Sequence, residues 1–212
     1  LTKAEGDLEG TFDLAVADVG SMVVSVVDEF SSLLSERDLK CQLSSKLNLR
    51  LSMDAQRIGQ VLRNLLNNAV KFSPPGSVIE INMWERDGLL GISVEDRGVG
   101  IPPDELETIF DKFIQSRRTK TRAGGTGLGL SICREILQAH QGRIWAENRA
   151  GGGSIFRLEI PIRSVPGAPP KSGGAPGTSG HAGDACPTAP AGRCPITEKA
   201  LAVSSQPEEH VA

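Results

Sequence analysis

The sequence predicts an α+β fold, in which amphipathic helices pack on a sheet built mainly from antiparallel hairpins. Segments whose apolar residues recur every three or four positions alternate with pairs of strand-like segments that are joined by short, glycine-containing turns. The chain is also long enough, at 212 residues with 39% hydrophobic residues, to form one sizeable core with room for a tail.

Composition narrows the classes of function. The net charge of −3 argues against a basic nucleic-acid binder, so no nucleic-acid partner is expected. No stretch approaches the roughly 18 apolar residues of a membrane span, and no signal peptide opens the sequence, which predicts a cytoplasmic segment. Neither a zinc site, a disulfide framework nor a catalytic triad is expected from the scattered Cys41, Cys133, Cys186, Cys194, His140, His181 and His210.

The first strong pattern runs from Phe12 to about Ser35 and predicts one amphipathic helix that packs on a sheet. Its apolar residues are Val16, Val19, Val23, Val26, Val27, Phe30, Leu33 and Leu34. Residues 46–51 then alternate between apolar and polar side chains, as a half-buried strand does.

A second amphipathic helix is predicted over residues 54–73, with Asp54 as its N-cap and a stop at residues 74–76, Pro-Pro-Gly. Its apolar stripe consists of Ile58, Val61, Leu62, Leu65 and Ala69. A neighbouring polar stripe consists of Arg57, Gln60, Asn64, Asn68 and Lys71.

The polar stripe presents two carboxamides and an ammonium in a row, because Asn64, Asn68 and Lys71 follow i, i+4, i+7 spacing. An amide oxygen can ligate Mg²⁺, and an ammonium can neutralise phosphate. Taken alone, such a stripe is more often a solvated polar face. Asn is a poor helix former, however, so three of them at positions 64, 67 and 68 indicate that helix propensity has been given up for another role.

The next segments predict an antiparallel hairpin over residues 78–84 and 89–95, which leads into a tight loop at Asp96 that contains Gly98, Gly100 and two prolines. Asp104 is expected to cap a short helix whose apolar residues are Leu106, Ile109, Phe110 and Phe113. Residues 115–122 form a basic polar loop. We expect residues 115–125 to be mobile without a ligand, since they contain few apolar anchors.

Glycines at 124, 125, 127 and 129 then open a helix over residues 131–141, which Gly142 ends. Unhindered backbone amides and a helix N-terminus both suit a phosphate. A second hairpin is predicted over residues 144–147 and 154–161. Residues 164–212 are rich in Pro, Gly, Ala and Ser, so we expect a disordered tail after a folded domain at residues 12–163.

Three features, each weak alone, together supply what Mg-ATP requires: the Asn-Asn-Lys stripe, an Asp at a strand end followed by glycines, and a glycine-rich helix start. At this point the chain resembles the ATP-binding catalytic domain of bacterial-type sensor histidine kinases, within the superfamily that includes gyrase, Hsp90 and MutL. The resemblance covers about residues 12–162 and rests on four boxes in the family order: the N box at 64–73, the G1 box at 96–102, the F box at 110–113 and the G2 box at 125–130.

The resemblance implies a two-layer α/β sandwich of the Bergerat type, with a mixed, mainly antiparallel sheet, helices on one face and a lid at residues 114–125. It implies ATP and Mg²⁺ as cofactors, with Asn68 on the metal, Asn64 and Lys71 near the phosphates as the further catalytic residues, and Asp96 on the adenine. The nucleotide-binding residues it implies are Asn64, Asn68, Lys71, Phe72, Asp96, Gly98, Gly100, Ile101, Phe113, Gly125, Thr126, Gly127, Leu128 and Gly129.

Two features indicate which branch of the superfamily the chain resembles, and the second is a departure from the histidine kinase pattern. The hydrolytic branch carries a Glu where this chain has Asn64, because a carboxylate is needed to activate water, so Asn64 favours phosphoryl transfer over ATP hydrolysis. Histidine kinases also place the acceptor histidine in an H box on a preceding helical hairpin, and no such box occurs in this sequence. Residues 1–11 are similar to the end of that hairpin or a linker, so the acceptor is expected outside the chain.

The sequence therefore predicts a histidine kinase catalytic domain that phosphorylates a histidine on a separate dimerisation domain, for relay to the receiver domain of a response regulator. A homodimeric parent protein, with or without a membrane anchor, is implied. Two alternatives remain: a regulatory module that nucleotide merely switches, and an ATPase of the gyrase and Hsp90 type.

Overall fold

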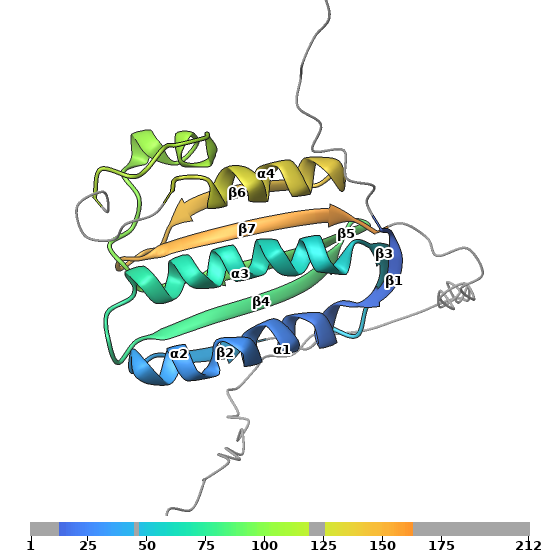
Figure 1. The fold of residues 1–212 in the computed structure, drawn as a ribbon, viewed down its shortest axis with the longest axis horizontal. Helices are drawn as coiled ribbons and strands as arrows, with labels where there is room; N and C mark the ends of the chain where they lie inside the picture. The colour runs from blue at the N-terminus through green and yellow to red at the C-terminus, as the bar shows by residue number, and fades with distance from the viewer. Residues whose placement is uncertain (1–12, 45–46, 119–125, 163–212) are drawn as a thin grey trace, which may run out of the picture. The chain divides into compact units, whose positions relative to one another are not determined.

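The computed structural model describes residues 13–44, 47–118 and 126–162 (Figure 1). The predicted tail at 164–212 and the predicted linker at 1–11 lie outside these ranges. The strands are β1 (Ala15–Asp18), β2 (Lys40–Leu43), β3 (Arg50–Met53), β4 (Val78–Arg86), β5 (Leu89–Glu95), β6 (Arg143–Asn148) and β7 (Ser154–Pro161). The helices are α1 (Val19–Glu29), α2 (Ser31–Glu36), α3 (Ala55–Phe72) and α4 (Gly129–Ala139), with short 3₁₀ turns η1 (Pro103–Glu105) and η2 (Thr108–Phe110).

The main sheet has five strands in the order β2-β4-β5-β7-β6. β2 pairs parallel to β4, and the other neighbours are antiparallel. Helices α1, α3 and α4 lie side by side on one face of this sheet (Figure 1). The predicted α+β sandwich, with a mixed but mainly antiparallel sheet and helices on one face, is confirmed.

Helix α3 lies at the centre of the helical layer, and its apolar stripe is buried as predicted. The Asp54 carboxylate caps the helix by accepting a hydrogen bond of 3.0 Å from the backbone N–H of Arg57. Burying each large aliphatic side chain stabilises the fold by roughly 1.5–3 kcal/mol. The same burial holds the polar stripe in a fixed orientation.

The prediction of a single helix from Phe12 to Ser35 is wrong. Ala15–Asp18 forms strand β1 on Arg50–Met53, and helix α1 begins only after Asp18, whose carboxylate caps it through the Ser21 N–H at 2.7 Å. The valines at 16 and 19 fit helical spacing, but β-branched residues also favour strands. Pairing with β3 and the local cap decide between the two.

Three shorter expectations also differ from the structure. Strand β2 was not predicted, because four residues carry too little pattern. The strand expected at 46–51 is shifted to Arg50–Met53. The helix expected after Asp104 is instead the two 3₁₀ turns η1 and η2, because Pro102 and Pro103 restrict the backbone and four apolar residues suffice to anchor irregular turns.

The opposite face of the main sheet carries both tryptophans of the chain. Trp84 alternates with buried residues along β4, and its indole packs against Gly91 of β5, where an added Cβ would stand 2.0 Å from the ring. Trp145 lies beside Arg157 in the β6–β7 pairing. This face is turned away from the helices.

None of the helices in the described ranges has both the length and the apolar character needed to span a membrane.

Candidate functional site

The second half of the polar stripe of α3, from Asn64 to Lys71, lines a cavity of about 320 Å³. The opposite walls come from the loop after β5, the segment after η2 and the start of α4. The cavity is lined by Asn64, Asn67, Asn68, Lys71, Phe72, Asp96, Val99, Gly100, Ile101, Ile109, Ile114, Gln115, Ser116, Thr126, Gly127, Gly129, Leu130, Ser154 and Phe156.

Asn64 joins the two helices that flank the cavity. Its Nδ2 donates to the backbone oxygen of Gly129 at 3.2 Å and lies 3.6 Å from the Sγ of Cys133. Burial raises the pKa of the Cys133 thiol to about 12, and the hydrogen bond from Asn64 offsets only part of this shift. Cys133 therefore stays a neutral packing residue, and the amide plane of Asn64 is fixed against α4.

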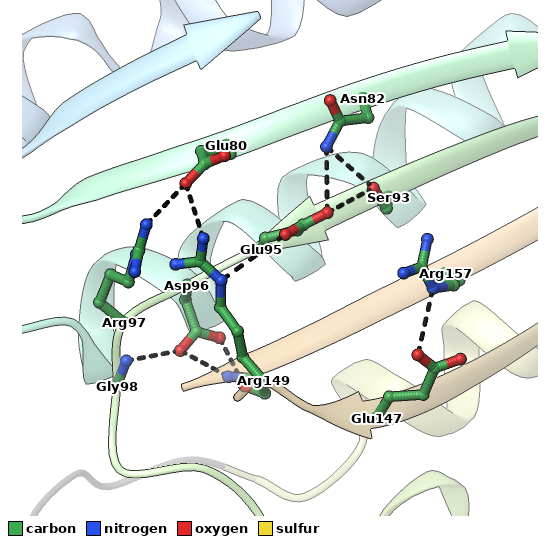
Figure 2. A network of polar contacts seen from close by, with 11 residues as sticks. Glu80, Asn82, Ser93, Glu95, Asp96, Arg97, Gly98, Glu147, Arg149 and Arg157 are labelled. Atoms are coloured by element: carbon green, nitrogen blue, oxygen red, sulfur yellow. Dashed lines mark hydrogen bonds and ion pairs between the residues drawn. The ribbon is translucent and has the colours of Figure 1, made fainter. Parts of the chain in front are cut away.

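Asp96 is a buried carboxylate at the floor of the cavity, with 3% of its surface exposed. Its Oδ1 accepts hydrogen bonds from the backbone N–H groups of Gly98 at 2.7 Å and Ser154 at 3.2 Å, and its Oδ2 accepts from the Ser154 hydroxyl (Figure 2). Burial raises the pKa of Asp96 above its usual value, although these hydrogen bonds oppose the shift. The sheet thus holds a buried polar acceptor in the wall of a cavity that both polar and apolar residues line.

The loop after Asp96 packs directly on the end of α3. A Cβ added at Gly98 would stand 2.8 Å from the backbone oxygen of Phe72, so only glycine allows this approach. Gly100 has a φ of +68°, which also favours glycine. Both glycines of the predicted G1 box therefore have a structural reason to be there.

The two ends of the predicted lid meet at Gly127. The backbone N–H of Phe113 donates to the Gly127 oxygen at 3.1 Å, and a Cβ on Gly127 would lie 2.9 Å from the Phe113 carbonyl carbon. The Phe113 side chain is 73% exposed and does not line the cavity. Its neighbour Ile114 lines the cavity instead.

The first residues of the predicted lid make specific contacts. The carboxylate of Glu105 accepts from the backbone N–H and the Nε of Arg117, the latter at 2.6 Å, and Asp104 pairs with the same guanidinium. Arg118 donates to the backbone oxygen of Val99 at 2.8 Å. Burial raises the pKa of Glu105, but hydrogen bonds from Ser116 and Arg117 outweigh it, so the net pKa is lowered. Residues 119–125 lie outside the described part.

Ten of the predicted site residues line one cavity: Asn64, Asn68, Lys71, Phe72, Asp96, Gly100, Ile101, Thr126, Gly127 and Gly129. Gly98 and Leu128 do not line it: Gly98 donates a hydrogen bond to Asp96, and Leu128 is the N-cap residue of α4. Gly125 lies outside the described residues.

Sequence reasoning missed Ser154 and Phe156 of β7, as well as the apolar residues Val99 and Leu130. Ser154 lies 58 positions from Asp96 in sequence, so no local spacing relates the two residues. The only available signal was its place as the first residue of a predicted strand after a run of glycines.

His140 is a structural residue at the far end of α4. It is 5% exposed, its Nε2 accepts from the backbone N–H of Asp54 at 3.2 Å, and its Nδ1 lies 2.8 Å from the oxygen of Ile136. The pair of contacts requires the proton on Nδ1. His140 thus joins the end of α4 to the N-cap of α3 and does not line the cavity.

Replacement of His140 by Leu is therefore expected to lower the free energy of unfolding by about 1–3 kcal/mol, because the buried Asp54 N–H loses its acceptor. Urea unfolding measures the loss. Nucleotide affinity of the folded protein should stay at the wild-type value. A loss of affinity at a temperature where the variant is fully folded would contradict a purely structural role.

Comparison with known families explains this arrangement. Residues 53–164 match the family model described as histidine kinase-, DNA gyrase B-, and HSP90-like ATPase. The chain belongs to this family. The match includes α3, the Asp96 loop, the start of α4 and the β6–β7 hairpin, which are the elements that build the cavity.

Within the ATPase family, the chain is similar to sensor histidine kinases. It is 40% identical over 138 residues to the sensor histidine kinase WalK of Bacillus subtilis, a match that covers 64% of this chain and 21% of WalK. It is 34% identical over 156 residues to the adaptive-response sensory kinase SasA of Prochlorococcus marinus, covering 73% of this chain and 41% of SasA. The chain thus spans less than half the length of these relatives.

Solved structures agree. The nucleotide-free catalytic domain of histidine kinase ThkA is 34% identical, has a TM-score of 0.62 and covers 70% of this chain and 95% of its own. Full-length ShkA in complex with AMPPNP is 30% identical, with a TM-score of 0.63, over 72% of this chain and 32% of its own. The described domain is the ATP-binding catalytic domain of a two-component histidine kinase.

Proposed function

We propose that this domain holds Mg-ATP in the cavity beside α3 and presents the γ-phosphate to a histidine on a separate dimerisation domain. The observation that carries the proposal is the convergence of Asn64, Asn68 and Lys71 from one helix with Asp96 from the sheet on a single cavity. The chemistry required is positioning and charge neutralisation, with no covalent intermediate on the protein.

Each polar group fits one part of the nucleotide. Asp96 is a buried acceptor in the cavity wall, which suits the exocyclic amine of adenine. The Asn68 amide oxygen suits Mg²⁺, and Lys71 suits phosphate oxygens. Gly127 and Gly129 precede or begin α4, whose N-terminal amides suit a phosphate. The AMPPNP bound to ShkA supports a triphosphate as the ligand of this fold.

Bound Mg²⁺ would supply charge neutralisation at the phosphates. The residues present fit a hard cation with few protein ligands, because Asn68 offers a neutral oxygen and water and phosphate oxygens complete such sites. Among the described residues no group of three or more His, Cys, Asp or Glu could hold a metal. The metal would therefore depend on the nucleotide.

The side chain at position 64 separates transfer from hydrolysis. A carboxylate there could accept a proton from water, whereas the Asn64 amide cannot act as a general base. Its Nδ2 is moreover engaged by Gly129. Position 64 therefore offers no general base to activate water for attack on the γ-phosphate. This favours transfer to a nucleophile on another domain over hydrolysis.

We also propose that the acceptor histidine lies on another domain of the parent protein. His140 is buried between α3 and α4, away from the cavity, and in-line attack needs contact near about 3 Å. His181 and His210 lie outside the described residues. A homodimeric parent with a helical dimerisation domain, placed in the cytoplasm with or without a membrane anchor, would supply the acceptor.

The phosphoryl group would then pass to the receiver domain of a response regulator. Support comes from the structure of ThkA in complex with the response regulator TrrA, which is 30% identical to this chain with a TM-score of 0.61 over 72% of this chain and 42% of that one.

Incubation with γ-labelled ATP, with and without a histidine-bearing helical hairpin, tests the proposal. The chain alone should stay unlabelled, and the hairpin should gain acid-labile, base-stable label, as phosphohistidine does. Free phosphate as the main product would favour a gyrase-type ATPase instead. Tight nucleotide binding with neither product would favour a regulatory module, and rapid acid-labile labelling of this chain alone would overturn the separate acceptor.

A further inference from the structure

Asn148, the last residue of β6, makes two hydrogen bonds to one residue of the facing loop. Its Oδ1 accepts from the backbone N–H of Ile101 at 2.8 Å, and its Nδ2 donates to the backbone oxygen of Ile101 at 2.7 Å. Two antiparallel strand residues exchange the same pair of bonds through their backbones. The Asn148 side chain therefore replaces the backbone of a further strand residue. It satisfies both the N–H and the carbonyl group of Ile101.

The two hydrogen bonds from Asn148 hold Ile101, the last residue of the loop at 96–101 that begins with Asp96. Asn148 lies opposite Ser154 in the β6–β7 pairing, and Ser154 holds Asp96 through its backbone N–H and its hydroxyl. Two directly paired residues thus hold the two ends of loop 96–101. Gly100 and Ile101 line the cavity, so the position of this wall depends on both contacts.

The hairpin end is itself fixed. Arg149 pairs with Glu80 at 3.1 Å and lies 3.8 Å from Glu95, while Arg97 pairs with Glu80 at 3.0 Å (Figure 2). The turn between β6 and β7 packs closely against the loop at 96–101. A Cβ on Gly153 would stand 2.0 Å from the backbone oxygen of Asp96. Asn148 thus lies at a hairpin end that ion pairs and close packing hold in place. Its amide can therefore fix the position of the loop at 96–101.

We propose that Asn148 is a positioning residue for nucleotide binding, which holds the Ile101 peptide so that Asp96 and the cavity wall are preorganised. Without the two bonds, the free loop samples other arrangements, and binding must order it again. The loss of affinity should come from the contacts to the adenine of the nucleotide. This inference rests on the proposed function, since the ligand is taken to be an adenine nucleotide.

Titration calorimetry of Asn148→Ala and Asn148→Asp with ADP and with Mg-ATP tests the inference. Loss of the two hydrogen bonds should weaken affinity on the order of tenfold, by the same factor for both nucleotides. Asp keeps the shape and the acceptor but cannot donate to the Ile101 oxygen, so it should also lose affinity. Gln138→Ala is the control: Gln138 is an exposed carboxamide near the end of α4 and does not line the cavity.

A merely structural role predicts a lower thermal midpoint with unchanged affinity of the folded protein at low temperature. That result, or wild-type affinity in the Asp variant, would overturn the role of Asn148 alone. Failure of the wild-type protein to bind either nucleotide would overturn the proposed function and the role of Asn148 with it. Tenfold weaker binding in both Asn148 variants, with Gln138→Ala at the wild-type value, supports the inference.

Discussion

Replacement of Asn68 by Ala is expected to abolish Mg²⁺-dependent phosphoryl transfer, with a loss on the order of 100-fold or more, and to leave the fold intact. Asn68 lines the cavity from the polar stripe of α3, and its amide oxygen is the proposed ligand for Mg²⁺. The stability of the helix should not fall, because Ala is the better helix former and the neighbouring buried stripe of α3 is unchanged.

Labelled-ATP transfer to the supplied histidine hairpin measures the effect, and circular dichroism checks the fold. Gln60→Ala is a suitable control, since Gln60 lies on the same stripe two turns earlier and does not line the cavity. Transfer by Asn68→Ala at more than about a tenth of the wild-type rate would show that the asparagine does not hold the metal.

Asp96→Asn is expected to weaken nucleotide binding without lowering the stability of the fold at neutral pH. An amide at position 96 can keep its oxygen where the Gly98 and Ser154 N–H groups donate, which places its NH₂ group where Oδ2 now accepts. A donor there would oppose the adenine amine and leave it unsatisfied. Nucleotide affinity should fall by roughly 10- to 100-fold or more, as expected for loss of a hydrogen bond to a charged acceptor.

The stability of the same variant should hold or rise at neutral pH. Burial raises the pKa of Asp96 above its usual value, so the folded chain binds this proton more tightly than the unfolded chain does. A raised folded pKa contributes stability below the unfolded pKa, and this contribution is lost as the pH rises through the folded pKa. The thermal midpoint of Asp96→Asn relative to wild type should therefore improve from pH 4 towards pH 7. A midpoint several degrees below wild type at pH 7 would show that the carboxylate stabilises the fold.

The part of the site on α3 was predictable because helical spacing is local. Asn64, Asn68 and Lys71 share a face at fixed intervals, and the apolar stripe beside them indicates which face is buried. The loop with Asp96, Gly98 and Gly100 was also predictable from the sequence, since it directly follows a strand. Both hairpins were predicted from alternation and turn residues, and the structure confirms them.

The contacts that hold the Asp96 loop were not predictable from local patterns. Ser154 and Asn148 act on residues 58 and 47 positions away, and only the strand register brings them together. The first helix was over-extended because the Val16 and Val19 spacing fits two structures, and the pairing partner of β1 lies more than thirty residues away. The pairing of Arg117 with Glu105 likewise needs the folded chain.

The central claim is that Mg-ATP binds in the cavity between α3, the Asp96 loop and the start of α4. Amide chemical shifts, followed during titration with a non-hydrolysable ATP analogue and Mg²⁺, test it most directly. We expect the perturbations to concentrate at residues 64–72, 96–101 and 126–130, while the indole N–H signals of Trp84 and Trp145, on the opposite sheet face, stay in place. Perturbations centred on the tryptophan face, or none at saturating analogue, would contradict the account.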